Sequence, residues 1–280
     1  GRGRRGPPPR ALARVRPVSA PGPESGPTFA DRAVYLPGAD ALVVADLHVG
    51  RGEASAVSLP LGERADLVDR LAALLDRFDP ATVVAAGDVV HTFDRVSGRS
   101  RETLDALRDA CEDRGAAFEL VAGNHDTALP NRWDGPVREE IVLGEGGDRE
   151  ADAVDATDAT RTVVCHGHEA PSATADRYVI GHVHPTIEIE GDRRPCFLRG
   201  PGTYRGADLL VLPSFTRLAP GVAVNEMRTD AFDSPLVTDA DRLAPVVVDP
   251  PAEGSDGGPD ASGAGEALRF PPLGEFRRLL

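Results

Sequence analysis

Histidine, aspartate and asparagine side chains gather in five short blocks of this sequence. The blocks read DLH at 46–48, GDVVH at 87–91, GNHD at 123–126, HGH at 166–168 and GHVH at 181–184, and together they hold all seven histidines of the chain. A single histidine on an apolar segment is usually structural, but seven beside Asp, Asn and Gly are not explained that way. Imidazole and carboxylate together suit Mn, Fe, Zn or Ni. The composition of the blocks therefore predicts a metal site.

Each block follows an apolar run that is typical of a β-strand. The runs are LVVA, TVVAA, FELVA, TVVC and RYVI, in chain order. In open α/β sheets, ligands bind at the carboxyl ends of the strands, so we expect the five blocks to meet at one edge. The spacing of Asp46 and His48, and of His182 and His184, places both side chains of each pair on one face of an extended chain.

The elements that must position these blocks alternate in the first half of the chain. Strands are predicted at 33–36, 42–45, 82–86 and 118–121, and amphipathic helices at 61–77 and 99–114. This order predicts an α/β fold with a largely parallel sheet. In the second half, short strands are predicted at 137–143, 162–165, 177–180, 186–190, 196–198 and 208–212. They indicate a second, more antiparallel sheet that packs on the first.

The ordered motifs D-x-H, G-D, G-N-H-D, H-G-H and G-H-x-H resemble the signature of calcineurin-like metallophosphoesterases over residues 29–225. The resemblance implies a four-layer α/β/β/α sandwich of two mixed sheets and two divalent metal ions. Manganese is the first expectation, with Fe, Zn or Ni as alternatives. The implied ligands are Asp46, His48 and His184 for one metal, Asn124, His166 and His182 for the other, and Asp88 as the bridge.

The same resemblance implies a reaction. A hydroxide between the metals attacks the phosphorus atom, and Asn124 helps to stabilise the charge that develops on the phosphate oxygens. His125, which is not needed as a ligand, is the expected general acid for the leaving oxygen. Asp126 is read as an ordinary capping residue of the next turn and receives no chemical role.

The roles of two further histidines, His91 and His168, can each be interpreted in two ways. His91 stands where many phosphatases of the superfamily have an aspartate, and the double-strand-break repair nucleases also have a histidine there, which contacts the phosphodiester. His91 is therefore expected to contact substrate or act in catalysis. The alternative is a structural role, in which it holds the metal ligands in place without touching substrate. His168 is expected either to position the ligand His166 or to face the substrate.

The substrate prediction rests on a smaller subgroup. ADLHVGRG (45–52), RPCF (194–197) and LPSF (212–215) resemble bacterial ligase-associated metallophosphoesterases and their archaeal relatives. This implies a phosphodiesterase that acts on nucleotides or nucleic-acid ends. The alternatives are a phosphomonoesterase with a small substrate and a non-catalytic metal-binding scaffold in a nucleic-acid processing complex. The intact ligand set and His125 argue against the scaffold.

The domain organisation follows from composition. Residues 1–28 are Arg- and Pro-rich and are predicted to be a disordered tail. Residues 29–248 form the catalytic domain, with a solvated acidic loop at 144–161. Residues 249–266 read as a flexible linker, and residues 267–280 as a segment that returns to pack on the edge of the domain.

The net charge is −14, and all 31 basic residues are arginine. Such a surface repels nucleic acid and anionic membranes at low salt. It suits a salt-adapted, halophilic cytoplasm, where self-repulsion is screened, although GC-rich coding also replaces lysine with arginine.

Three cysteines without a CxxC pair argue against a disulfide scaffold and for a reducing compartment. No apolar run approaches the roughly 18 residues of a membrane span. We therefore expect a cytoplasmic enzyme with no membrane partner, whose protein partners the sequence leaves open.

Overall fold

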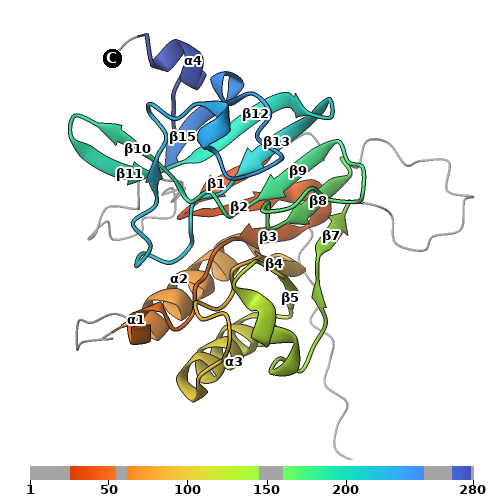
Figure 1. Ribbon diagram of the computed structural model, residues 1–280. Coiled ribbons are helices and arrows are strands. Elements are labelled where there is room, and N and C mark those ends of the chain that lie inside the picture. The colour runs from red at the N-terminus through yellow and green to blue at the C-terminus, as the bar shows by residue number, and fades with distance from the viewer. Residues whose placement is uncertain (1–25, 55–61, 145–159, 249–266, 279–280) are drawn as a thin grey trace, which may run out of the picture.

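Two β-sheets lie face to face in the computed structural model of this protein, and helices cover the outer face of the first sheet (Figure 1). The structure describes residues 26–54, 62–144, 160–248 and 267–278. Most of the predicted N-terminal tail, nearly all of the acidic loop and the whole linker therefore lie outside the described residues.

The first sheet has six strands in sequence order. They are β1 (Thr28–Ala30), β2 (Ala33–Leu36), β3 (Ala41–Val44), β4 (Thr82–Ala86), β5 (Ala117–Val121) and β6 (Val137–Arg138). Strands β3 to β6 are parallel, and β1 and β2 are added to β3 in antiparallel fashion. The predicted order of alternating strands and helices with a largely parallel sheet is therefore confirmed.

Helices α2 (Glu63–Phe78) and α3 (Gly98–Glu112) cover this sheet, and a short helix, α1 (Arg51–Ala54), precedes them. Leu67, Leu71 and Leu74 recur at helical spacing on α2 and are buried, which gives the helix one apolar face for the sheet. Helix α3 begins after Ser97, whose hydroxyl accepts a hydrogen bond from the Ser100 amide at 2.9 Å. This is the usual way to satisfy a free amide at a helix start.

The second sheet has seven strands in the order β16-β15-β12-β13-β9-β8-β7. Their bounds are β7 (Glu140–Leu143), β8 (Thr162–Cys165), β9 (Arg177–Ile180), β12 (Phe197–Tyr204), β13 (Ala207–Val211), β15 (Ala244–Val248) and β16 (Ala267–Arg269). Strands β8, β9 and β13 are parallel, and the other pairs are antiparallel. A third, smaller sheet joins β10 (Pro185–Ile189), β11 (Asp192–Pro195) and β14 (Val222–Ala223).

Three apolar clusters define the layers. One packs α2 and α3 on the first sheet, and it contains Leu71 and Leu107 of the helices and Leu42 of β3. A second lies between the sheets, where Val84 belongs to the first sheet and Val164 to the second. A third covers the far face of the second sheet. The four layers expected from the resemblance are thus present.

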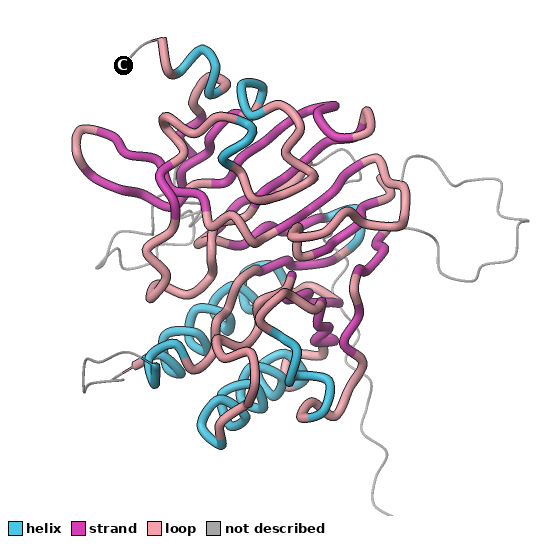
Figure 2. Tube along the Cα trace, in the orientation of Figure 1, coloured by secondary structure: helices cyan, strands magenta, loops and turns pink. Residues whose placement is uncertain are grey.

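The fourth layer is made of short segments in place of long helices. It contains the 3-10 turns η3 (Thr229–Ala231) and η4 (Ala240–Arg242) and the short helix α4 (Leu273–Phe276). Figure 2 shows how little helix lies on this side of the molecule. Strand β16 pairs with β15, so residues 267–269 form one edge of the second sheet.

The continuous strand predicted at 137–143 is wrong. Val137 pairs with Leu120 in the first sheet, whereas Ile141 pairs with Val164 in the second. The chain therefore passes from one sheet to the other at Glu139, and each half of the apolar run serves a different sheet. Among the described residues, no helix is both long enough and apolar enough to cross a membrane.

Candidate metal centre

The five polar blocks come together because five strands end at one edge of the stacked sheets. Blocks 46–48, 87–91 and 123–126 follow the parallel strands β3, β4 and β5, and blocks 166–168 and 181–184 follow the parallel strands β8 and β9. Both sheets therefore contribute to a single site, as the strand-end pattern predicts.

Asp46, His48, Asp88 and His184 converge most tightly. Each offers one ligand atom, and these four atoms all lie within 4.8 Å of one another. The Nε2 atom of His184 lies 3.3 Å from that of His48 and 3.3 Å from Oδ1 of Asp46. Two ligand atoms bound at about 2.1 Å to one ion are about 3.0–3.4 Å apart, so this spacing fits a metal.

The three other predicted ligands lie outside this cluster, and one of them, His166, has its Nε2 atom 3.2 Å from Oδ1 of Asp46. Nε2 of His166 is 3.6 Å from Oδ1 of Asp88, and the His182 ring lies 4.8 Å from the His166 ring. The buried Oδ1 of Asn124 has no hydrogen-bond partner among the described residues, which suits an oxygen that binds an ion.

This second group is looser than the first. Nε2 of His182 lies 3.9 Å from the exposed carboxylate of Asp233, and neither His166 nor His182 belongs to the tight clusters found in the described part of the chain. The structure thus brings the seven predicted ligands to one edge, with four of them in contact range of a single ion.

The backbone is strained at five of these positions. Positive φ angles occur at Asp46 (54°), His48 (43°), Asp88 (46°), His182 (66°) and His184 (49°). Such angles in residues with a side chain cost about 1–3 kcal/mol each and persist where the surroundings enforce them. They point these side chains toward the site.

Contacts from the second sheet hold Asp46 in this conformation. The Ser214 hydroxyl donates to the Asp46 carbonyl oxygen at 2.8 Å, and the Phe215 amide donates to Ala45 at 2.8 Å. The His182 amide donates to the Asp46 carboxylate at 3.0 Å. These bonds join the ends of β3, β9 and β13.

Glycine is required where two of the blocks meet. A Cβ atom at Gly181 would lie 2.6 Å from Oδ2 of Asp46, and one at Gly123 would collide with Asp88. Because no side chain fits at either position, the backbone reaches the carboxylates closely.

In the metal-free site, Asp46 and His48 already have the protonation states that metal binding needs, whereas the Asp46 carboxylate outweighs burial and raises the pKa values of His166 and His184. Burial alone would raise the pKa of Asp46, but the charge of His184 and a hydrogen bond from His166 hold it well below its usual range. Burial lowers the pKa of His48 to about 3, so its ring is neutral at pH 7. An ionised carboxylate beside a neutral imidazole is the protonation state that metal binding needs.

His125 and His91 lie at the mouth of the site. Nδ1 of His125 lies 2.8 Å from the carbonyl oxygen of His91, so it carries a proton and donates it there. Ring nitrogens of His48, His91 and His125 lie within 4.8 Å of one another. Burial lowers the pKa of His91, and the Arg51 charge adds to this effect. Nδ1 of His91 is buried without a hydrogen-bond partner among the described residues.

His168 contacts the predicted ligand His166. Their Nδ1 atoms are 2.9 Å apart, which is a hydrogen bond between two rings. A histidine that binds a metal through one nitrogen commonly bonds a neighbour through the other. This contact favours the positioning role of His168 over the substrate-facing one.

Asp126 has a role that the sequence reading missed. It is buried and accepts hydrogen bonds from the amides of Val89, Val90 and Gly123, at 3.0, 2.9 and 2.8 Å. Its side chain makes no cap for the turn that follows. Instead it ties the loop of Asp88 to the loop of His125, and burial raises its pKa to about 6.

Phe93 and Ser214 were also missed. The Phe93 ring is half exposed and stacks on His125, with ring centres 3.9 Å apart. The signal for Ser214 was available, since LPSF follows β13 as the other blocks follow their strands. Phe93 gave no signal, because an aromatic residue in a loop has no distinctive spacing.

Comparison with known proteins places this geometry in a family. Residues 40–211 match the family described as calcineurin-like phosphoesterase. A nuclease of Pseudomonas putida, MPE, has 23% sequence identity and a TM-score of 0.50, over 78% of this chain and 88% of its own.

The phosphoesterase YfcE of E. coli has 16% identity and a TM-score of 0.37, over 67% of this chain and 84% of its own. No curated protein matches the sequence. The family match covers more than half of the chain, which therefore belongs to the calcineurin-like phosphoesterases.

Proposed function

We propose that this metal-dependent phosphoesterase cleaves phosphodiesters, with nucleotides or nucleic-acid ends as its substrates. The cluster of His48, His91 and His125 carries this proposal. A carboxylate at position 91 would repel an anionic diester, whereas burial keeps the His91 ring neutral, by lowering its pKa. A neutral ring can donate a hydrogen bond to the phosphate or to its second ester group.

We further propose how the chain holds two divalent ions, for which manganese is the first expectation. Asp46, His48 and His184 bind one ion, Asn124, His166 and His182 bind the other, and Asp88 binds both. When bound, two such ions lower the pKa of a water molecule and polarise the phosphate oxygens. The converging Nε2 and Oδ atoms and the unpartnered Oδ1 of Asn124 support this assignment.

His125 is the general acid of the proposed reaction. The His91 carbonyl fixes one proton on Nδ1, so the proton that moves is the one on Nε2. Nε2 lies 3.8 Å from Oδ2 of Asp88, on the side of the ring that faces the metal site. From there it protonates the leaving oxygen, and its partly exposed ring exchanges protons with water.

The test compares bis-p-nitrophenyl phosphate with p-nitrophenyl phosphate in the presence of Mn. The proposal expects a clear preference for the diester, followed by turnover of nucleotides or oligonucleotides in a substrate panel. Preference for the monoester would favour the alternative, a phosphomonoesterase. Bound metal without turnover of either compound would favour a metal-binding scaffold.

We also propose a reducing, salt-rich cytoplasm as the compartment. Cys111 and Cys165 are buried free thiols whose pKa values burial raises to about 12, so they remain uncharged and unreactive. The net charge of −14 is repulsive at low salt and screened at high salt. Thermal melting between low and molar KCl tests the salt adaptation, which predicts a melting temperature that rises with salt.

A further inference from the structure

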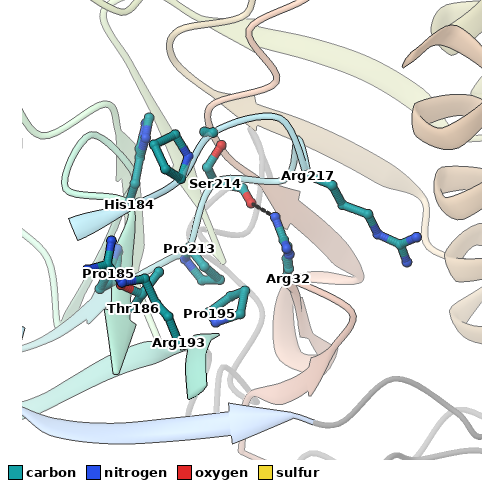
Figure 3. A pocket seen from close by; sticks show the side chains of 12 residues that line it. Arg32, His184, Pro185, Thr186, Arg193, Pro195, Pro213, Ser214 and Arg217 are labelled. Atoms are coloured by element: carbon teal, nitrogen blue, oxygen red, sulfur yellow. Dashed lines mark hydrogen bonds between the residues drawn. The ribbon is translucent and has the colours of Figure 1, made fainter. Parts of the chain in front are cut away.

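A pocket of about 210 Å³ lies beside the proposed metal centre and shares His184 with it. Figure 3 shows its wall, to which Arg32, Arg193 and Arg217 contribute. No carboxylate of the described residues lines it. In a chain with a net charge of −14, a cavity with arginines and no acid is a local exception that favours an anion.

Among the residues that the structure describes, no ion pair neutralises the charges of two of these arginines. Nη1 of Arg32 donates to the carbonyl oxygen of Ser214 at 3.2 Å (Figure 3) and to that of Thr216 at 2.7 Å, which fixes the guanidinium in place. Carbonyl groups leave its charge intact. Burial lowers the pKa of Arg32 to about 10, so it is still protonated at neutral pH.

Arg193 lies on β11, where Glu188 is its cross-strand neighbour. In the described part of the chain, its guanidinium makes no ion pair. Arg217 differs from both, because it pairs with Asp66 at 3.1 Å and points away from the other labelled side chains in Figure 3. Arg32 and Arg193 are therefore the anion-binding groups of the pocket.

Thr186 provides an independent sign of a ligand. Thr186 lines the pocket, and its buried hydroxyl has no hydrogen-bond partner among the described residues. A buried hydroxyl without a partner costs free energy, and a phosphate oxygen would accept its proton. Thr186 and Arg193 lie on the same face of the β10–β11 hairpin, since Thr186 pairs with Pro195 and Glu188 with Arg193.

We propose that this pocket binds a second phosphate of the substrate, the neighbour of the cleaved phosphate in a single-stranded oligonucleotide. The inference rests on the proposed phosphodiesterase function. The volume is below the roughly 300–1,000 Å³ of pockets that hold a whole ligand, so it suits one group of a longer chain. Arg32, Arg193 and Thr186 would bind that group while the metal centre holds its neighbour.

The experiment compares a thymidine dinucleotide, which has one phosphate, with a thymidine trinucleotide, which has two. The wild-type protein with Mn should cleave the trinucleotide with a kcat/KM about tenfold higher, beyond the twofold expected from its two bonds. In Arg193→Ala this advantage should fall to the statistical twofold, while activity on the dinucleotide stays within about twofold. The plot of log binding constant against log salt concentration for the trinucleotide should also become less steep in Arg193→Ala, by roughly 0.7 in slope.

Arg194→Ala is the matched control. Arg194 is the next residue on β11 and lies on the opposite face, paired with the buried Ile187. The Arg194→Ala substitution removes the same charge as Arg193→Ala, and the variant should keep the trinucleotide advantage. Melting temperatures of both variants establish that they fold.

The outcomes separate the two proposals. Failure to cleave either substrate would refute the phosphodiesterase function itself. Cleavage of the dinucleotide without a trinucleotide advantage, or an advantage that survives in Arg193→Ala, would overturn the second-phosphate site alone. An equal loss on both substrates would also overturn it, because Arg193 would then act on the cleaved phosphate.

Discussion

Nδ1 of His125 lies 2.8 Å from the backbone carbonyl oxygen of His91. The contact is made by backbone, so it needs no particular side chain at position 91. It fixes which nitrogen of His125 carries the stable proton and which one is free to exchange protons with a substrate. The side chain of His91 is thereby available for another task at the mouth of the site.

His125→Ala should retain bound metal and lose most turnover. General acids contribute about 10²–10⁴-fold to rate, so kcat should fall within this range. The metal content of the purified protein, measured by elemental analysis, should stay at the wild-type value. Full activity in the variant, or loss of the metal, would refute the assignment of His125 as the acid.

The His125 variant has a useful chemical check. A leaving group with a low pKa needs little protonation, so p-nitrophenolate esters should suffer less than nucleotide esters. An equal loss on both ester types would point to a role of His125 in binding.

His91→Asp should shift the substrate preference. The carboxylate would repel the phosphate, and the neutral ring that suits the second ester group would be lost. We expect kcat/KM for bis-p-nitrophenyl phosphate to fall about tenfold or more, with a smaller change for the monoester. His91→Asn, which is neutral, is the control that separates charge from shape. A diester-to-monoester ratio that stays the same in both variants would contradict a substrate contact by His91.

Phe93→Ala should lower kcat with little effect on metal content. The Phe93 ring stacks on His125 at 3.9 Å, and Thr127 donates a hydrogen bond to the Phe93 carbonyl, so the ring is held over the acid. Aromatic contacts of this kind are worth about 0.5–1.5 kcal/mol, which corresponds to a loss of rate of about 2- to 12-fold. Phe93→Tyr should restore the rate.

Leu218→Ala is the control for Phe93, because Leu218 is comparably exposed, at 47% against 50%. If both alanine variants lose activity equally, the effect of Phe93 is not specific to the His125 contact.

Removal of metal should lower the melting temperature. Strained φ angles at Asp46 and Asp88 bring two carboxylates toward one point, and a cation that binds only the folded state stabilises it by about 2.7 kcal/mol at 100 times its Kd. Melting with Mn and with EDTA measures this difference. His184→Ala should reduce the Mn-induced shift in melting temperature, since it removes one of the four converging ligands. Arg228→Ala is the control: Arg228 is exposed and is not one of the predicted ligands, so this variant should keep the full shift.

Much of this site could be predicted because strand ends and metal ligands both leave strong sequence signals. The apolar runs before Asp46, Asp88 and His166 located the edge of the sheets at which the site lies. The order of the motifs indicated the family of calcineurin-like phosphoesterases. The resemblance implied the fourth layer, but the elements that form it could not be located in the sequence, because 3-10 turns have no regular period of apolar residues. The crossing at Glu139 was hidden for a similar reason: both halves of the run are apolar, and only pairing partners far along the chain distinguish them.

Asp126 shows the other kind of limit. An aspartate after a turn is usually a cap or exposed, and its burial depends on the amides of Val89, Val90 and Gly123, which reach it only in the folded chain. Its consequence is a dependence of stability on pH. The folded pKa of Asp126 is raised to about 6, from 3.8, so the folded state binds this proton more tightly than the unfolded state.

In the metal-free protein, the contribution of Asp126 to stability is therefore fully present below pH 3.8 and is lost as the pH rises toward 6. The loss is on the order of 3 kcal/mol, because one pKa unit corresponds to about 1.36 kcal/mol. Asp126→Asn removes this titration while the other groups of the site titrate as before. Unfolding free energies of wild type and variant are measured in urea with EDTA from pH 4 to pH 7. As the pH rises, the wild type should lose stability relative to the variant. Parallel curves over that range would show that the buried carboxylate does not take up a proton, and that the three amides alone are sufficient to keep it ionised.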